Sequence, residues 1–129
     1  MRLLIDTHIL IWWVSDLDKI PKRIQALMRA EENEVSVSAV SAWEIAIKVH
    51  LRKLAFDRAF LDDFDASLLA LAFTPLAITS GHAVAAAHLK GRHKDPFVRL
   101  LAAQARCEQL TVITADPHIT ALGALTMWI

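Results

Sequence analysis

Short apolar runs that end in a polar residue constrain this fold more than any other feature of the sequence. Leu3-Leu4-Ile5 runs directly into Asp6, and residues 111–114 lead to Asp116. A continuous apolar run of this length is typical of a strand buried on both faces, as in parallel sheets. Residues 34–37 and 76–78 predict two more strands, and residues 125–128 predict an edge strand.

Helical patterns alternate with these strands. This alternation predicts right-handed crossovers and therefore a three-layer α/β/α sandwich around a central, mainly parallel sheet. The chain has 129 residues, so we expect a single domain over residues 1–129. Helices are predicted over residues 9–14, 57–73, 80–89 and 96–108, and Ser80 is expected to cap the third of these. A further helix is expected to begin at Pro21, and another to run from a cap at Ser38 or Ser41 to about residue 54.

Composition limits the possible partners. The chain has 14 basic and 14 acidic residues, so it is not a general polyanion binder, and any nucleic-acid site needs a local patch or a groove between two copies. The apolar share of 55% and three of the four tryptophans, Trp12, Trp13 and Trp43, predict a surface that is buried on association, although these rings, Trp43 above all, would also suit the core. We expect a homodimer.

The single cysteine and the N-terminus bear on the compartment. Cys107 excludes an internal disulfide, fits a reducing cytoplasm and is expected to be a small buried residue on a helix. The apolar start is interrupted by Asp6 and His8 and is too short to span a membrane. We expect a soluble cytoplasmic protein with no membrane partner.

Three acidic residues, Asp6, Glu44 and Asp116, occupy positions typical of catalytic or metal-binding carboxylates. Asp6 and Asp116 follow strands, and in α/β sheets sites form beyond the carboxyl ends of the strands. Glu44 interrupts an apolar helix face, and a buried carboxylate is costly unless it is paired or bound to a cation. The alternatives are helix capping for the two aspartates and an ion pair with Lys48 for Glu44. Asp95-Pro96 repeats the pattern of Asp116-Pro117, so Asp95 either caps a helix or binds metal.

Converging carboxylates favour a hard divalent cation. Like charges a few ångströms apart raise one another's pKa, and Mg²⁺ with its oxygen ligands and retained waters relieves the repulsion. Such an ion suits a phosphodiester substrate. The six histidines show no zinc-like spacing, and the three glycines form no phosphate loop.

Four segments together resemble the motifs of PIN-domain ribonucleases of the VapC toxin type. They are residues 4–8, 41–48, 93–105 and 111–116, and because they follow one another in order and at the family spacing, the resemblance extends over essentially the whole chain. The resemblance implies a Mg²⁺- or Mn²⁺-dependent endoribonuclease, the toxin of a toxin–antitoxin pair. It implies that Asp6, Glu44 and Asp116 are metal-binding and catalytic, with Asp95 as a further candidate. It also implies a VapB-type antitoxin that inserts into the active-site groove and through which operator DNA is contacted.

One position departs from the family pattern. The third motif usually reads Asp-Pro-Phe-Asp-Arg, whereas this chain has Asp95-Pro96-Phe97-Val98-Arg99, so Val98 takes the place of the family's main third-motif acid. Valine binds neither a metal nor a water. The sequence therefore also allows a catalytically dead PIN fold that acts only as an antitoxin-binding module.

Several basic residues stand close to the acidic motifs in the sequence. The basic residues that flank the acidic motifs are the candidates for RNA contacts, namely Lys48, Lys90, Arg92, Lys94 and Arg99.

An aspartate-nucleophile phosphatase or a phospho-receiver also begins with a strand that ends in Asp. The phosphatase would need an acid where His8 stands, the receiver would need a lysine after Asp116, and neither explains Glu44.

Overall fold

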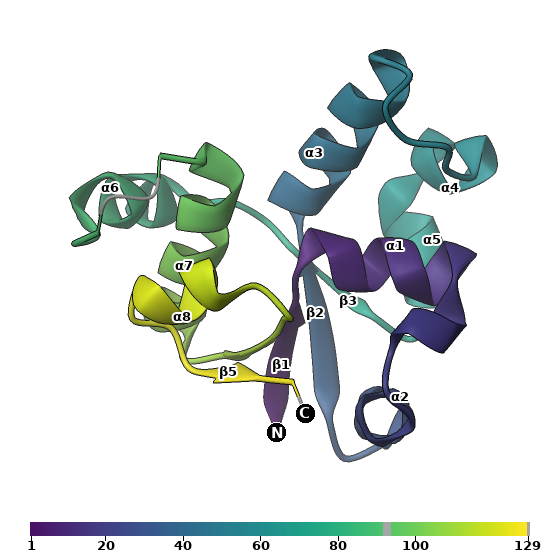
Figure 1. Cartoon of the computed structure of the whole chain (residues 1–129), viewed down its shortest axis with the longest axis horizontal. Coiled ribbons are helices and arrows are strands. Elements are labelled where there is room, and N and C mark those ends of the chain that lie inside the picture. Colours follow the sequence, from purple (N-terminus) through teal and green to yellow (C-terminus); the bar gives the residue numbers. More distant parts are fainter. Residues whose placement is uncertain (92–93, 129) are drawn as a thin grey trace.

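A five-stranded, entirely parallel sheet forms the centre of the computed structural model (Figure 1), which describes residues 1–91 and 94–128. The strands are β1 (Arg2–Ile5), β2 (Glu34–Ser38), β3 (Thr74–Leu76), β4 (Thr111–Ile113) and β5 (Thr126–Met127), arranged in the order β3-β2-β1-β4-β5. The helices are α1 (Thr7–Ser15), the 3-10 turn η1 (Leu17–Lys19), α2 (Lys22–Arg29), α3 (Ala39–His50), α4 (Arg58–Asp62), α5 (Phe64–Ala70), α6 (Ser80–His88), α7 (Pro96–Glu108) and α8 (Pro117–Ala121).

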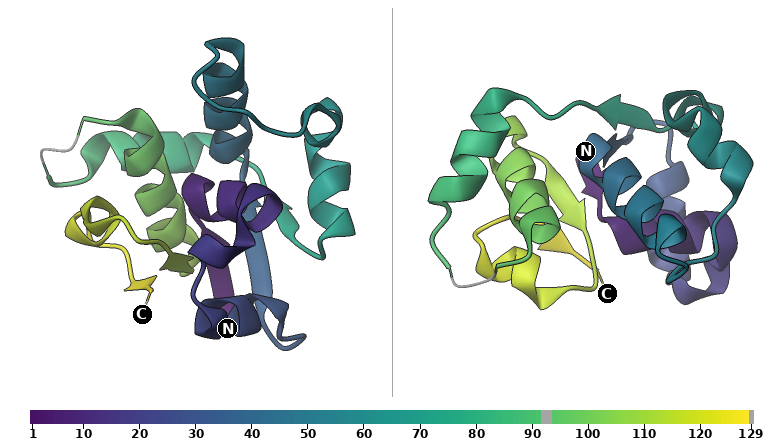
Figure 2. Two further views of the ribbon diagram at one scale, coloured as in Figure 1. Left: turned by 45° about the vertical axis from the view of Figure 1, so that its right-hand side comes forward. Right: turned by 90° about the horizontal axis from the view of Figure 1, so that it is seen from above.

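Helices cover both faces of the sheet, as predicted. Leu3 and Ile5 of β1 point into a core shared with α1 to α5, whereas Leu4 points into a second core shared with α7 and α8. The two groups of helices lie on opposite sides of the sheet, with α6 outside α7 (Figure 2). The continuous apolar run of β1 is therefore explained by burial on both sides.

The strand order reverses beside β1. The chain moves outward from β1 to β2 and β3, and then returns to place β4 on the other side of β1. The carboxyl ends of β1 and β4 therefore meet at a topological switch point, where ligand sites form in open α/β sheets. Among the described helices, none combines the length and the hydropathy needed to cross a bilayer.

Helix α3 ends at His50, four residues before the predicted end at about residue 54. Arg52 has a left-handed backbone with φ 57°, Arg52 N donates to Val49 O, and Lys53 N donates to Lys48 O. This pair of bonds is a Schellman motif, which usually uses glycine at the left-handed position. Because arginine stands there, the sequence carries no stop signal.

Three further sequence predictions are corrected. The predicted helix 57–73 is divided into α4 and α5, because Asp63 leaves the helical conformation and its carboxylate accepts a hydrogen bond from Ala66 N. Strand β3 begins at Thr74, not residue 76, because its register pairs Thr74 with Ser36 and Leu76 with Ser38. Helix α6 is capped by Thr79, not Ser80, in a reciprocal box with His82.

Two side chains differ from expectation in burial. Cys107 is exposed and not buried as expected, because the buried part of α7 ends at Ala105 and Cys107 lies in the last, exposed turn of the helix. Trp43 is 55% exposed, whereas Trp12 and Trp13 are half-buried against the first core. Trp43, which was expected in the core, is thus the most exposed of the three.

Arg99 joins α7 to the end of α6. Its guanidinium donates to Ala86 O at 2.8 Å, to Leu89 O at 2.7 Å and to Gly91 O at 3.4 Å. Two of these carbonyls lie at the C-terminus of α6, where backbone acceptors have no intrahelical partner and a cation is favoured. This arrangement favours a structural use of Arg99.

We predict that Arg99→Gln lowers the free energy of unfolding by about 1.5–3 kcal/mol, the usual worth of hydrogen bonds to a charged group. Urea denaturation followed by circular dichroism measures the change. The matched control is Arg58→Gln on the exposed start of α4, which we expect to stay within about 0.5 kcal/mol of the parent. Equal stability of the two variants would show that the Arg99 bonds contribute nothing.

Candidate active site

Asp6 is the buried centre of the candidate site. It is the first residue after β1 and the N-cap of α1, and it is 4% exposed. Oδ1 accepts a hydrogen bond from Ile9 N at 3.1 Å, and Oδ2 accepts one from Thr114 Oγ1. Burial raises the pKa of the Asp6 carboxyl above its ordinary value, and these hydrogen bonds offset only part of that effect.

Thr114 connects Asp6 to Asp116. The hydroxyl that donates to Asp6 also accepts from Asp116 N at 2.9 Å. Asp116 caps α8, and its Oδ1 lies 2.9 Å from both the backbone N and the Nδ1 of His118. Sequence reasoning missed Thr114, although a hydroxyl residue two positions before a strand-end aspartate was a visible signal.

The two aspartates share one hollow, which we call the acidic cavity. It has a volume of about 240 Å³ and is lined by Asp6, His8, Ile9, Trp12, Ala115 and Asp116. It opens at the switch point between β1 and β4, because these strands lead directly into the two aspartates.

Glu44 lies on α3 and is 7% exposed. Its Oε2 accepts from Lys48 Nζ at 2.7 Å, so the ion pair that the sequence offered as an alternative is present. One turn earlier, Ser41 Oγ lies 2.9 Å from Thr7 Oγ1, which ties α3 to the residue next to Asp6. Glu44 therefore lies on the helix that packs beside Asp6, but it does not line the acidic cavity.

Asp95 and Val98 lie in the first turn of α7. Asp95 is its N-cap, and Oδ1 accepts from Phe97 N at 2.9 Å and from Val98 N at 3.5 Å. Val98 is half-buried and packs against the core around Leu4 and Leu101. Asp95 therefore caps a helix, which was one of its two predicted roles, and it does not line the acidic cavity.

The donor set fits a divalent cation held by few protein ligands. Among residues 1–91 and 94–128, no three His, Cys, Asp or Glu side chains lie close enough to share one ion. Mg²⁺, however, is commonly bound by one or two carboxylates, with waters and substrate phosphates completing its shell. The Asp6 carboxylate accepts hydrogen bonds from Thr114 Oγ1 and from the backbone N–H groups of Ile9 and His8, and an ionised carboxylate has about four lone-pair sites, so Asp6 retains capacity for a cation.

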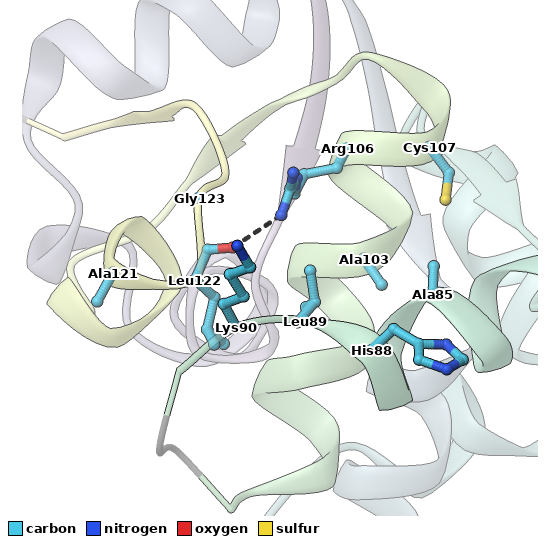
Figure 3. Close-up of a pocket in the computed structure, with 10 residues that line it drawn as sticks. All are labelled: Ala85, His88, Leu89, Lys90, Ala103, Arg106, Cys107, Ala121, Leu122 and Gly123. Carbon is cyan, nitrogen blue, oxygen red and sulfur yellow. Dashed lines mark hydrogen bonds between the residues drawn. The ribbon is translucent and has the colours of Figure 1, made fainter.

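The predicted RNA contacts are spread over the molecule. Lys48 pairs with Glu44, and Lys94 is exposed next to Asp95, whereas Arg92 lies outside the described residues. Lys90 lines a different cavity of about 670 Å³ together with His88 and Arg106, between α6, α7 and the end of α8 (Figure 3). There Arg106 Nη1 donates to Leu122 O at 3.5 Å. We call this hollow the α6–α8 cavity.

We predict that Asp6→Asn stabilises the protein at neutral and alkaline pH. The folded-state pKa of Asp6 lies above its ordinary value of 3.8, so the stability from the protonated form is present below about pH 4 and is lost as pH rises through the raised pKa. Asn keeps the cap but carries no charge. In thermal melts with EDTA, Asp6→Asn should exceed the parent in Tm at pH 8, and the gap should close towards pH 4.

Asp116→Asn is the matched control, because the Asp116 side chain is 33% exposed. We expect no comparable gain from it at pH 8. A Tm gap for Asp6→Asn that stayed constant from pH 4 to pH 8 would show that desolvation of the carboxylate is not its cause.

Comparisons with known proteins identify the family and the fold. The sequence profile described as PIN domain matches residues 3–125, and no curated protein sequence matches the chain. A VapBC2 structure from Rickettsia felis bound to a promoter DNA fragment is similar at TM-score 0.72 and 13% identity, covering 98% of each chain. VapBC-1 from nontypeable Haemophilus influenzae has TM-score 0.70 and 15% identity, covering 98% of this chain and 97% of that one. VapBC-5 from Mycobacterium tuberculosis has TM-score 0.60 and 22% identity, covering 99% and 98%.

The profile match covers most of the chain, and these similarities extend the shared fold over nearly all of it. The PIN-domain match sets aside the phosphatase and receiver alternatives. The chain belongs to the PIN-domain family.

Proposed function

We propose that this chain is a VapC-type toxin whose fold carries a Mg²⁺- or Mn²⁺-dependent endoribonuclease site. The observation that carries the proposal is the acidic cavity, where Asp6 and Asp116 meet at the switch point of a PIN fold. Solved structures similar to it include VapBC complexes and another toxin–antitoxin complex. The substrate is RNA with unpaired bases, since sequence-specific recognition of RNA uses single-stranded segments.

The residues of the site take separate parts in this function. Asp6 and Asp116 hold the cation, and Thr114 fixes the orientation of the Asp6 carboxylate. A bound divalent ion supplies positive charge to the phosphodiester and lowers the pKa of the attacking water. Glu44 would join them once a substrate phosphate draws Lys48 away, because a single hydrogen bond joins Glu44 to Lys48. Asp95 holds the first turn of α7 at the edge of the site.

Val98 weakens this machinery in the present chain. It lies in the first turn of α7, where the positive end of the helix dipole would favour an acid. An apolar side chain there removes an oxygen ligand or the anchor of a ligand water, and a misplaced water costs large factors in rate. The second candidate function, a catalytically dead PIN fold that only binds antitoxin, rests on this same residue.

We predict weak or absent cleavage of total cellular RNA by the chain as written and metal-dependent cleavage by Val98→Asp. Because a misplaced group of this kind typically costs about 100-fold, we expect at least that gain in rate. The measurement is the rate with Mg²⁺ or Mn²⁺, with the cut sites mapped, together with growth arrest of an expressing host. The control is Val98→Asn, which has a similar shape but lacks the charge.

The double variant Asp6→Asn with Val98→Asp should lose the restored activity. If the parent cuts RNA as fast as Val98→Asp, Asp95 is the third ligand and Val98 is not the missing position. If neither cuts any RNA while both bind antitoxin, the binding-module function stands instead.

The partner in this proposal is a small VapB-type antitoxin, and the toxin itself forms a homodimer. Trp43 on α3 is 55% exposed, and its ring packs edge-on against Phe97 of α7 with centroids 5.0 Å apart. Val98 follows Phe97, so the apolar surface adjoins the third motif. An exposed aromatic residue backed by a second ring is a typical anchor for a partner segment. Operator DNA is contacted through the antitoxin.

We predict that Trp43→Ala weakens binding of the small protein encoded beside this gene by about 30-fold or more, as expected for an interface hot spot. The exposed ring contributes little to the core, so the free energy of unfolding should change little. Calorimetric titration and urea denaturation measure the two quantities. Leu125→Ala is the control, because Leu125 is 74% exposed and precedes the edge strand β5. Equal affinity of the two variants would place the antitoxin elsewhere.

A further inference from the structure

A second hollow adjoins the acidic cavity. It has a volume of about 410 Å³, and its charged and aromatic lining comprises His8, Trp12, Asp16, Lys19, Lys48 and Lys53. His8 and Trp12 also line the acidic cavity. The two hollows therefore meet along these rings, whose centroids are 6.2 Å apart. We call the second hollow the lysine cavity.

Its positively charged side chains come from η1 and from the end of α3. The Schellman motif that ends α3 brings the backbones of Lys48 and Lys53 together through a bond from Lys53 N to Lys48 O at 2.8 Å, and both lysines line the hollow. Lys48 pairs with Glu44, and Lys19 lies 3.6 Å from Asp16. In the described part of the chain, no carboxylate lies within ion-pair distance of Lys53.

Trp12 supplies an aromatic surface between the acids and the lysines. It is half-buried, which fixes the ring, and it faces both hollows. Lys19 Nζ lies 5.9 Å from its centroid. A positively charged groove with an aromatic ring on which bases stack is the arrangement by which proteins bind single-stranded nucleic acid.

We propose that the lysine cavity is a subsite for single-stranded RNA, in which an unpaired base lies against Trp12 and a neighbouring phosphate contacts Lys53 and Lys48. The inference rests on the proposed ribonuclease function and names the path that the substrate takes from the acidic cavity. A phosphate drawn to Lys48 also competes for the ion pair that holds Glu44. Substrate binding and release of Glu44 are then the same event.

The α6–α8 cavity does not offer an equivalent path (Figure 3). It is lined by the basic residues His88, Lys90 and Arg106, but otherwise by aliphatic residues, glycine and Cys107. It shares no lining residue with the acidic cavity and has no Phe or Trp for a base to stack on. It therefore serves as the competing arm of the test.

The test measures RNA affinity without cleavage. Fluorescence anisotropy with a labelled ten-nucleotide single-stranded RNA in EDTA compares Lys53→Gln, Lys90→Gln and Lys22→Gln, the last on the exposed start of α2. We expect Lys53→Gln to weaken binding and to reduce the slope of log K against log salt by about 0.7, the value for one lost phosphate contact. Lys53→Arg should restore both, and the other two variants should match the parent.

Base stacking is tested separately. Trp12→Leu should lose at least about fivefold in affinity, the lower end of base–aromatic stacking, whereas Trp12→Phe should retain most of it. Replacing the bases of the RNA one at a time by abasic sites should weaken binding at one position for the parent and not for Trp12→Leu. Thermal melts verify that each variant is folded. The Lys53 series does not depend on the tryptophan variants.

Several results would overturn the proposal. They are unchanged RNA affinity for Lys53→Gln and Trp12→Leu, a larger loss for Lys90→Gln than for Lys53→Gln, or a Lys53→Gln variant that loses antitoxin affinity but keeps RNA affinity. If Val98→Asp cleaves RNA while the cavity variants bind normally, only this subsite fails. If Val98→Asp does not cleave while those variants lose RNA affinity, the nuclease function fails and the RNA subsite stands.

Discussion

The hydrogen bond between Thr114 and Asp6 is the contact on which the site depends. It joins the ends of β1 and β4, which are separated by 108 residues in the sequence and are neighbours only because the strand order reverses beside β1. The same hydroxyl accepts from Asp116 N, so one side chain sets the positions of both aspartates. Burial of Asp6 raises its pKa, and a cation or a proton relieves the cost of that charge.

The acids of this protein serve the fold as well as the site. Asp6, Asp95 and Asp116 are the N-caps of α1, α7 and α8, and each carboxylate accepts backbone N–H groups of the helix that follows. Helix starts attract negative charge and substrate phosphates alike, so capping and metal binding are compatible at one edge of a parallel sheet. The capping and functional interpretations of these residues were alternatives in the sequence, whereas the structure allows both to hold for Asp6 and Asp116.

The positions of the basic residues in space do not follow their positions in the sequence. Basic residues that flank the acidic motifs are dispersed: Arg99 holds the end of α6, and Lys90 faces the α6–α8 cavity. Lys48, another of these flanking residues, does line the lysine cavity, where it is joined by Lys19 of η1 and by Lys53 after the end of α3. Proximity in sequence to an acidic motif therefore predicted the place of Lys48 but not those of Lys90 and Arg99, because helices carry neighbouring residues to different faces.

The sequence by itself determined the α/β class, the buried strand β1, the start of α7 at Asp95-Pro96 and the burial of Glu44, because apolar runs, periodicity and capping residues are local signals. It did not determine the break at Asp63 or the end of α3 at a left-handed Arg52, where no glycine or proline marks the change. Only the tertiary structure decided that Thr114 bridges Asp6 to Asp116 and that Trp12 separates the acids from the lysines. These contacts join segments far apart in the chain, and their geometry depends on strand order and register, which no local pattern encodes.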